Sequence, residues 1–298
     1  MHYRTILPAL VAIAPDVNAH YMFVRFSHKG VWEAPLGAGG IRNRTAPFEE
    51  QALYNTNYYT RVFNDPTYHM DYPNSVRCGR GNMDHANETA IIDVDAGDTI
   101  EVAHESADPV YWRDDYFNNC PGDRGTCDPR WNGLYFIHWG PMIVHLSKAP
   151  DGQDARTYDG SGDWVKIYTF GLRRHNDSTF DWPLYGPRGL DLPRFTFKIP
   201  VQTPPGQYLM RMDVPWIGQV NSYGHVPTQM YPSCAQLSIR SNSTAAFPKG
   251  VKMPDIFMPE APGMETSPDM RELKVVDEGF VYPGGPLWDG ETMVVDKP

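Results

Sequence analysis

The stretch that decides the fold is TAIIDVDAGDTIEVAHE, at Thr89–Glu105. Apolar and polar residues alternate on both sides of Ala-Gly-Asp at its centre, and a period of two is typical of half-buried β-strands. The central tripeptide, residues 96–98, is a turn signal. We therefore predict that the two alternating runs fold into a β-hairpin.

Five further segments have the same character. Each is a strand-length run rich in Ile, Val, Phe, Tyr or Thr, and each is bounded by Gly, Pro, Asp or Ser. They are residues 140–148, 163–171, 194–200, 206–214 and 234–240. No long helical period competes with these runs. The chain is therefore predicted to be an all-β protein, a β-sandwich with long loops.

The composition limits the classes of partner. With 298 residues and 41% hydrophobic content, the chain is long enough to bury a sizeable core. Its net charge of -10 argues against nucleic acid or an anionic membrane as the main partner, because both favour clustered Lys and Arg. An uncharged or weakly charged substrate fits this composition better.

The N-terminus resembles a cleavable secretory signal over residues 1–19. An apolar run at 5–14, too short to cross a bilayer, is followed by small residues at Val17 and Ala19. A short N-terminal core strand or helix is the alternative interpretation. With cleavage after Ala19, we expect a secreted, extracellular chain in which residues 20–298 form a single domain.

Two other features fit export. Four Asn-x-Ser/Thr sequons mark candidate glycosylation sites. These are Asn43, Asn87, Asn176 and Asn242. Four cysteines, an even number, indicate two disulfides in an oxidising compartment.

Proximity selects one of the three possible cysteine pairings. Cys120 and Cys127 lie in one Pro/Gly/Asp-rich loop that a bridge can staple, which leaves Cys78 and Cys234 to close a long loop. In the chain-entropy model, the long-range bridge contributes about 4–5 kcal/mol. A zinc site of four thiolates is discarded because paired C-x-x-C spacing is absent.

The composition changes over residues 247–298, where Pro, Met, Asp and Glu dominate as in many disordered tails. Large aromatic residues such as Phe257, Phe280 and Trp288 argue against a solvated tail. We expect this C-terminal strap, residues 247–298, to wrap the sandwich, with a mobile stretch near 265–269.

Cleavage after Ala19 would make His20 the first residue, which then offers two nitrogens, the α-amine and the imidazole. Together they can close a chelate ring on one metal ion. Neutral nitrogen donors at right angles suit Cu(II) better than hard cations, which prefer oxygen. The alternative is a histidine that merely starts a strand, and a second ligand decides between the two interpretations.

His138 is the candidate for the third nitrogen. It precedes Gly140-Pro141 at the entrance to a predicted strand, where loops carry function. His145 lies seven positions further on, so a regular strand points it to the opposite face. We expect His145 to be a packed or surface strand residue and not a ligand.

Gln229 and Tyr231 are two positions apart and share a face on an extended backbone. The phenol of Tyr231 can approach a metal axially, and Gln229 can hydrogen-bond the phenol or an oxygen species beside it. Taken alone, this pair would be interpreted as core packing.

Eight blocks in order resemble the fungal lytic polysaccharide monooxygenases of auxiliary activity family 9, formerly glycoside hydrolase family 61. They are HYMFVRF, RCGRGN, DAGDTIEV, HWGPMIVHLSKAP, GSGDWVKIY, FTFKIP with PPGQYLMRMDV, TQMYPSCAQLSI and YPGGP. They extend from His20 to about Trp288. Their order and spacing make the set fairly specific, and the chain resembles a divergent member.

The resemblance implies an immunoglobulin-like, or fibronectin-like, β-sandwich with a flat face. At the centre of that face it implies one copper ion per chain in a histidine brace formed by His20 and His138. Tyr231 would be the axial ligand, with Gln229 beside it. The resemblance also implies the two disulfides that proximity selects.

The implied reaction is oxidation of a glycosidic C1 or C4 carbon of cellulose or a related β-glucan. It uses oxygen or hydrogen peroxide and an external electron donor, and chain scission follows. A one-electron metal is needed because no acid and base pair can oxidise an unactivated C–H bond. Tyr21 and Tyr282 are candidates to stack on sugar rings, with ordinary packing as the alternative. We expect a monomer without a nucleic-acid or membrane partner.

Three positions depart from the family pattern. Gly218 stands where relatives commonly have a histidine that helps to position oxygen, and neither Gln219 nor His225 is in register with it. His145 replaces a strand tyrosine, and an acidic residue survives as Asp213. These departures concern turnover more than copper binding.

Two other classes of function therefore stay open. One is an extracellular histidine-brace copper-binding protein without polysaccharide oxidation. The other is a carbohydrate-binding or structural β-sandwich without metal chemistry.

Overall fold

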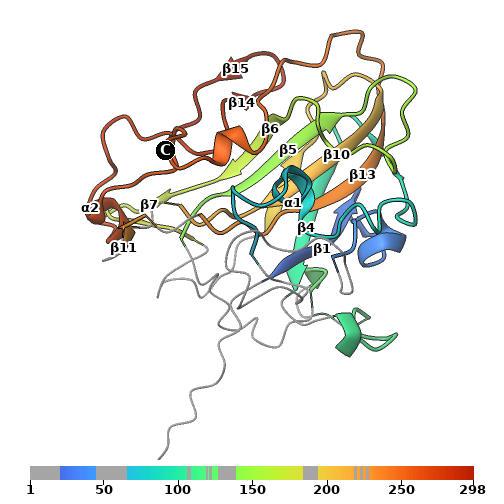
Figure 1. Ribbon diagram of the computed structural model, residues 1–298, viewed down its shortest axis with the longest axis horizontal. Helices are drawn as coiled ribbons and strands as arrows, with labels where there is room; N and C mark the ends of the chain where they lie inside the picture. The colour runs from blue at the N-terminus through green and yellow to red at the C-terminus, as the bar shows by residue number, and fades with distance from the viewer. Residues whose placement is uncertain are drawn as a thin grey trace, which may run out of the picture.

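The two larger β-sheets of the described residues pack face to face (Figure 1). The computed structural model describes residues 21–44, 66–105, 109–118, 120, 123–126, 139–183, 194–217, 220–221, 224–225 and 228–298. Within these ranges, no helix has the length and apolar character that a membrane span requires.

The smaller sheet has four strands in the order β2-β1-β4-β9, all antiparallel. Its strands are β2 (Val31–Trp32), β1 (Met22–His28), β4 (Thr99–Glu105) and β9 (Phe195–Lys198).

The larger sheet has seven strands in the order β15-β14-β6-β5-β10-β13-β3. Its strands are β15 (Met293–Val294), β14 (Leu287–Trp288), β6 (Val165–Phe170), β5 (Met142–Lys148), β10 (Gly206–Asp213), β13 (Ser233–Arg240) and β3 (Ile92–Asp95). The β13–β3 and β14–β6 pairs are parallel, and the other pairs are antiparallel.

The remaining elements are short. Two small ribbons pair β7 (Arg173–Arg174) with β8 (Phe180–Asp181) and β11 (Val220–Asn221) with β12 (Gly224–His225). The helices are α1 (Pro73–Cys78), α2 (Pro268–Arg271) and the 3-10 turns η1 (Leu36–Gly39), η2 (Pro109–Tyr111) and η5 (Asp255–Phe257). The predicted β-sandwich is therefore confirmed.

Side-chain alternation along β5 shows how the layers form. Met142, Val144 and Leu146 lie in the core between the two sheets. The alternate residues, His145 among them, lie on the outer face of the larger sheet. That face carries a second apolar cluster, to which the C-terminal strap contributes Met253, Phe257, Met264, Met270, Phe280 and Tyr282. The strap, orange to red in Figure 1, thus covers a sheet face that would otherwise meet solvent.

The predicted hairpin over Thr89–Glu105 is wrong, because β3 and β4 belong to different sheets. β3 pairs with β13 and β4 pairs with β1 and β9. The turn between them carries the chain from one sheet to the other: Ala96 donates its N–H to Arg240 O at 2.9 Å, and Gly97 donates to Ile199 O at 2.8 Å. A period of two identifies a strand but does not choose its partner.

The stretch 265–269, for which mobility is predicted, contains the N-cap of α2. Ser267 caps α2, since its Oγ accepts the N–H of Met270 at 3.1 Å. Its own N–H donates to Asp277 Oδ2 at 2.7 Å. The side chain of Met270 is buried in the outer apolar cluster, so cap and core together hold this part of the strap.

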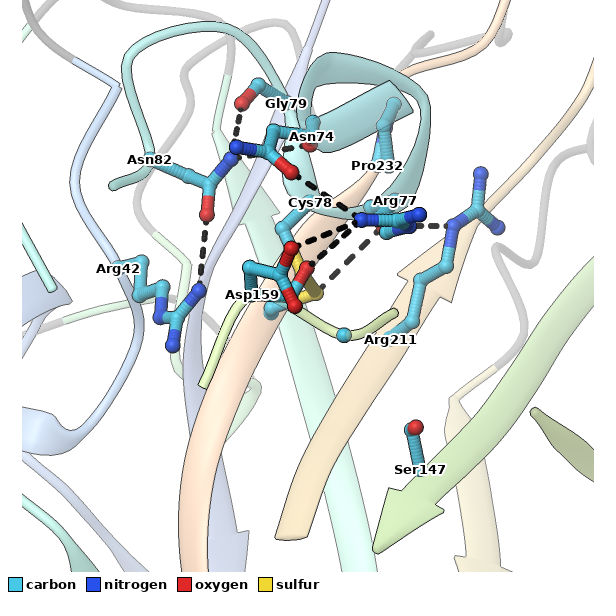
Figure 2. Close-up of a disulfide and its surroundings, with 12 residues drawn as sticks. Arg42, Asn74, Arg77, Cys78, Gly79, Asn82, Ser147, Asp159, Arg211 and Pro232 are labelled. Carbon is cyan, nitrogen blue, oxygen red and sulfur yellow. Dashed lines mark hydrogen bonds and ion pairs between the residues drawn. A yellow bond between two sulfur atoms is a disulfide. The ribbon is translucent and has the colours of Figure 1, made fainter. Parts of the chain in front are cut away.

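The long-range disulfide Cys78–Cys234 is confirmed, with a sequence separation of 156. It joins the end of α1 to β13 (Figure 2). Beside it, the carbonyl oxygen of Arg77 accepts a hydrogen bond from Arg211 Nε at 2.9 Å. The guanidinium of Arg77 pairs with Asp159 at 3.2 Å. The bridge therefore lies within a network that ties α1 to the larger sheet.

The second predicted bridge is only partly within the described residues. Cys120 is disulfide-bonded, and Cys127 lies outside the described residues. Of the sequon asparagines, Asn87, Asn176 and Asn242 are exposed and Asn43 is half-buried.

His145 connects β5 to the strap. It is fully buried, and its Nε2–H donates to Gly284 O at 2.8 Å. Gly284 has a φ of 91°, and a Cβ there would lie 2.9 Å from the imidazole, so this contact requires glycine. Burial lowers the pKa of His145 well below its ordinary value, and the charges of Arg211 and Lys166 lower this pKa further.

We expect this histidine to make the fold sensitive to acid. Its pKa is depressed in the folded state, so below about pH 6.5 the unfolded chain binds the extra proton first and folding becomes less favourable. Relative to His145→Gln, which keeps a donor for Gly284 but does not titrate, the wild type should lose up to about 1.4 kcal/mol of unfolding free energy per pH unit. Urea unfolding of both proteins between pH 7.5 and pH 5 measures this difference. Parallel curves for the two proteins would contradict the expectation.

Candidate metal centre

The predicted pair Gln229 and Tyr231 is brought together at the N-terminal end of β13. The hydroxyl of Tyr231 donates to Gln229 Oε1 at 2.8 Å, so the two side chains share a face as predicted. Tyr231 is 1% exposed. Its ring is held by the core, and its hydroxyl direction is set by an amide oxygen.

A buried ion pair fixes the backbone of Tyr231. Its N–H donates to Asp213 Oδ1 at 2.7 Å, and Asp213 Oδ2 accepts from Arg211 Nη2 at 2.7 Å. Both charged side chains are fully buried. Burial raises the pKa of Asp213, and Arg211 and the Tyr231 N–H oppose that rise. Arg211 also donates to the carbonyl of Arg77 at the end of α1, as Figure 2 shows, so the pair is anchored from two elements.

Tyr21 lies against Tyr231, with ring centroids 4.8 Å apart and ring planes at 33°. The side chain of Tyr21 is 4% exposed. Its ring also packs edge-to-face against Phe23 at 5.6 Å and His104 at 5.8 Å. The predicted sugar-stacking role of Tyr21 is therefore corrected, because no ring face is presented to solvent.

The same correction applies to Tyr282, which is 6% exposed. Its ring packs against Phe280 at 5.6 Å and Trp182 at 6.5 Å, and its hydroxyl accepts the N–H of Leu172 at 2.8 Å. Burial raises the pKa of Tyr282 to about 12. Tyr282 fastens the strap to the larger sheet and offers no surface to a sugar.

The two predicted nitrogen ligands, His20 and His138, lie outside the described residues. Their chain neighbours, however, are described. Tyr21, next to His20, packs on Tyr231. Trp139, next to His138, packs edge-to-face on Trp216 at 5.9 Å.

Trp216 in turn connects Trp139 to the amide–phenol pair. The backbone N–H of Trp216 donates to Gln229 O at 2.8 Å. The chain neighbours of both predicted ligands are thus connected to the Gln229–Tyr231 pair, Tyr21 directly and Trp139 through Trp216.

The phenol–amide pair can supply only part of a copper site. Among the residues that the structure describes, no group of His, Cys, Asp and Glu is gathered as a metal site. The donors described here are a phenol and an amide oxygen, which are poor copper ligands by themselves. Nitrogen donors from His20 and His138, whose neighbours converge on this place, would complete a donor set that suits copper.

The positions that depart from the family pattern are only partly described. Gly218 and Gln219 lie outside the described residues, and His225 is on β12. Asp213 contacts Tyr231 by accepting its backbone N–H.

Sequence reasoning gave packing only as the alternative for Tyr21 and assigned no role to Trp216. A signal for Tyr21 was present in the sequence. The run YMFV at 21–24 is apolar at every position, a pattern typical of strands buried on both faces. No comparable pattern marks Trp216, because its contacts come from distant parts of the chain.

The described residues thus form a β-sandwich with a buried phenol–amide pair just before β13. Residues 20–272 match the model of Auxiliary Activity family 9 (formerly GH61). The chain belongs to this family. Its members are copper-dependent lytic polysaccharide monooxygenases, which are oxidoreductases that act on polysaccharides.

Individual relatives agree with this assignment. The chain is 27% identical to AA9 family lytic polysaccharide monooxygenase G of Aspergillus tamarii, over 94% of this chain and 69% of the relative. It is 28% identical to monooxygenase A of Aspergillus fumigatus, over 95% of this chain and 81% of the relative.

Solved structures agree on the fold. The cellulose-active polysaccharide monooxygenase from M. thermophila superposes with a TM-score of 0.57 at 20% identity, covering 91% of this chain and 99% of that one. The extended catalytic domain of H. jecorina LPMO9A gives 0.55 at 18% identity, covering 93% and 94%.

Proposed function

We propose that this chain is a secreted, copper-dependent lytic polysaccharide monooxygenase that oxidises glycosidic bonds of cellulose or a related β-glucan at C1 or C4. The observation that carries the proposal is the convergence at the candidate site. The neighbours of His20 and His138 reach the Gln229–Tyr231 pair through separate contacts.

In this proposal the α-amine and imidazole of His20 and the imidazole of His138 would hold one copper ion per chain. The phenol of Tyr231 would supply an oxygen donor to the same ion. When bound, copper supplies the one-electron chemistry that acid and base groups lack. Gln229 Oε1 accepts a hydrogen bond from the hydroxyl of Tyr231, and this bond directs a lone pair of the phenol oxygen away from the amide. The buried rings of Tyr21 and Tyr231 exclude water from the core side of the site.

The other parts of the proposal follow from export and from the reaction. Residues 1–19 are removed as a signal, and residues 20–298 act as a monomeric single domain. The partners are the insoluble polysaccharide, oxygen or hydrogen peroxide, and an external electron donor. The three exposed sequons, Asn87, Asn176 and Asn242, are accessible for glycans on a secreted chain.

One observation favours a second function, a histidine-brace copper-binding protein without polysaccharide oxidation. Gly218 stands where relatives commonly have a histidine that helps to position oxygen, and glycine has no side chain for that task. Loss of this group leaves the proposed copper ligands intact. The chain could then bind copper without oxidising polysaccharide.

The test uses correctly processed protein that begins at His20, incubated with several insoluble glucans, a reductant and peroxide. We expect copper-dependent release of oxidised oligosaccharides, identified by mass spectrometry. The matched control carries one extra residue ahead of His20, which converts the amine to an amide that no longer donates well. We expect that control to lose both tight copper binding and the products.

The outcomes distinguish the candidate functions. Tight copper binding without oxidised products would reject the monooxygenase and favour the copper-binding protein. Weak copper binding by the processed chain would reject both and favour a sandwich without metal chemistry.

A further inference from the structure

We propose that Tyr21 is a positioning residue, which holds the ring of Tyr231 and fixes the start of β1 against the end of β10. The residue next to it, His20, and the phenol of Tyr231 would thereby keep a constant relation to each other. This inference rests on the proposed function, because His20 and Tyr231 matter together only if both serve the metal.

The hydroxyl of Tyr21 is the first half of this connection. It accepts the N–H of Val214 at 2.9 Å and faces Val214 O at 3.4 Å as a donor. Donor and acceptor capacities are thus both directed at one residue, which lies directly after β10.

The ring of Tyr21 is the second half. Its centroid is 4.8 Å from that of Tyr231, on the core side of the phenol. Phe23 and His104 support the ring edge-to-face from β1 and β4. Aromatic contacts of this kind stabilise beyond the area that they bury, so the ring has a preferred place.

The contacts form a closed circuit. Tyr21 hydrogen-bonds Val214, which is the chain neighbour of Asp213. Asp213 accepts the backbone N–H of Tyr231, and the ring of Tyr231 returns to Tyr21. The backbone and the ring of Tyr231 are therefore both held against the C-terminal end of β10. Among the residues of this circuit, Tyr21 is the one next to His20 in the chain.

Position distinguishes this role from ordinary core packing. Tyr208 is equally buried, and its hydroxyl donates to Pro204 O at 2.8 Å. Its ring packs on Phe247. None of these contacts involves Gln229 or Tyr231, which makes Tyr208 a matched control for a buried tyrosine with a hydrogen bond to the backbone.

The test compares Tyr21→Phe, Tyr21→Leu and Tyr208→Phe, each as the processed protein of residues 20–298. The readouts are the electron paramagnetic resonance spectrum of bound Cu(II), the copper dissociation constant and the melting temperature without metal. Loss of the hydroxyl in Tyr21→Phe, and of the ring too in Tyr21→Leu, should change the spectral g and hyperfine values. We expect copper affinity to fall about tenfold in the leucine variant, the range for residues that orient ligands.

Tyr208→Phe should lower the melting temperature by about as much as Tyr21→Phe but leave spectrum and affinity at wild-type values. If neither Tyr21 variant changes the spectrum or affinity more than Tyr208→Phe does, the positioning role is wrong. The phenylalanine variant conserves volume, so it serves even if the leucine variant does not fold. Wild-type protein that binds no copper would overturn the proposed function as well, whereas normal copper binding in all variants would overturn only this inference.

Discussion

Replacing His138 by alanine is expected to weaken copper binding by more than about two orders of magnitude. Loss of a residue that merely orients a ligand already costs about 10–100-fold in metal affinity, so loss of one of three nitrogen donors should cost more. Isothermal calorimetry on processed protein measures the effect, with circular dichroism to show that the variant is folded.

His145→Gln is the matched control for this loss. The imidazole of His145 lies on the outer face of the larger sheet and donates a hydrogen bond to Gly284 O of the strap. Glutamine can donate to the same carbonyl. Copper affinity should stay within about twofold of the wild type. Similar losses in both variants would mean that the ligand is assigned to the wrong histidine.

The second large effect concerns the buried pair behind Tyr231. Asp213→Asn should lower the free energy of unfolding by about 3–5 kcal/mol, because it leaves the buried charge of Arg211 without its counter-charge. Denaturant unfolding followed by circular dichroism measures this loss. Asp163→Asn removes the partner of the partly exposed Lys252 and should cost less than about 1 kcal/mol.

A double variant separates the charge effect from general damage. Replacing Arg211 by methionine together with Asp213 by leucine removes both charges, so most of the stability should return. Part of the loss should persist, because the N–H of Tyr231 no longer has its acceptor. A double variant as unstable as Asp213→Asn would show that the unpaired charge is not the cause.

The sandwich was predictable from sequence because strand-length runs bounded by turn residues recur along the chain, several of them with a period of two, but strand pairing was not predictable. At Thr89–Glu105 the alternation located β3 and β4 correctly, and the turn between them leads to the opposite sheet and not to a hairpin. Pairing depends on partners far along the chain, such as β13 for β3, and local patterns contain no such information.

The candidate site shows the same division. The spacing of Gln229 and Tyr231 fixed their shared face, because that relation is local. Sequence reasoning left open whether Tyr21 and Tyr282 are exposed or packed, because exposure depends on what covers each ring. Tyr21 is covered by Tyr231 and its neighbours, and Tyr282 by Phe280 and Trp182. The sequence around either tyrosine does not predict all of these partners.

The position of Lys166 has a consequence for biosynthesis. Its ammonium group is fully buried on β6, where Asp296 pairs with it at 2.7 Å and Pro283 O, 117 positions later in the chain, accepts a hydrogen bond at 2.9 Å. During synthesis Lys166 emerges before its partners Asp296 and Pro283, and an uncompensated ammonium resists desolvation. The outer face of the larger sheet is therefore not expected to close around this cation until the end of the chain is present. Chains truncated before Pro283 should leave this apolar face uncovered and the charge of Lys166 without Asp296.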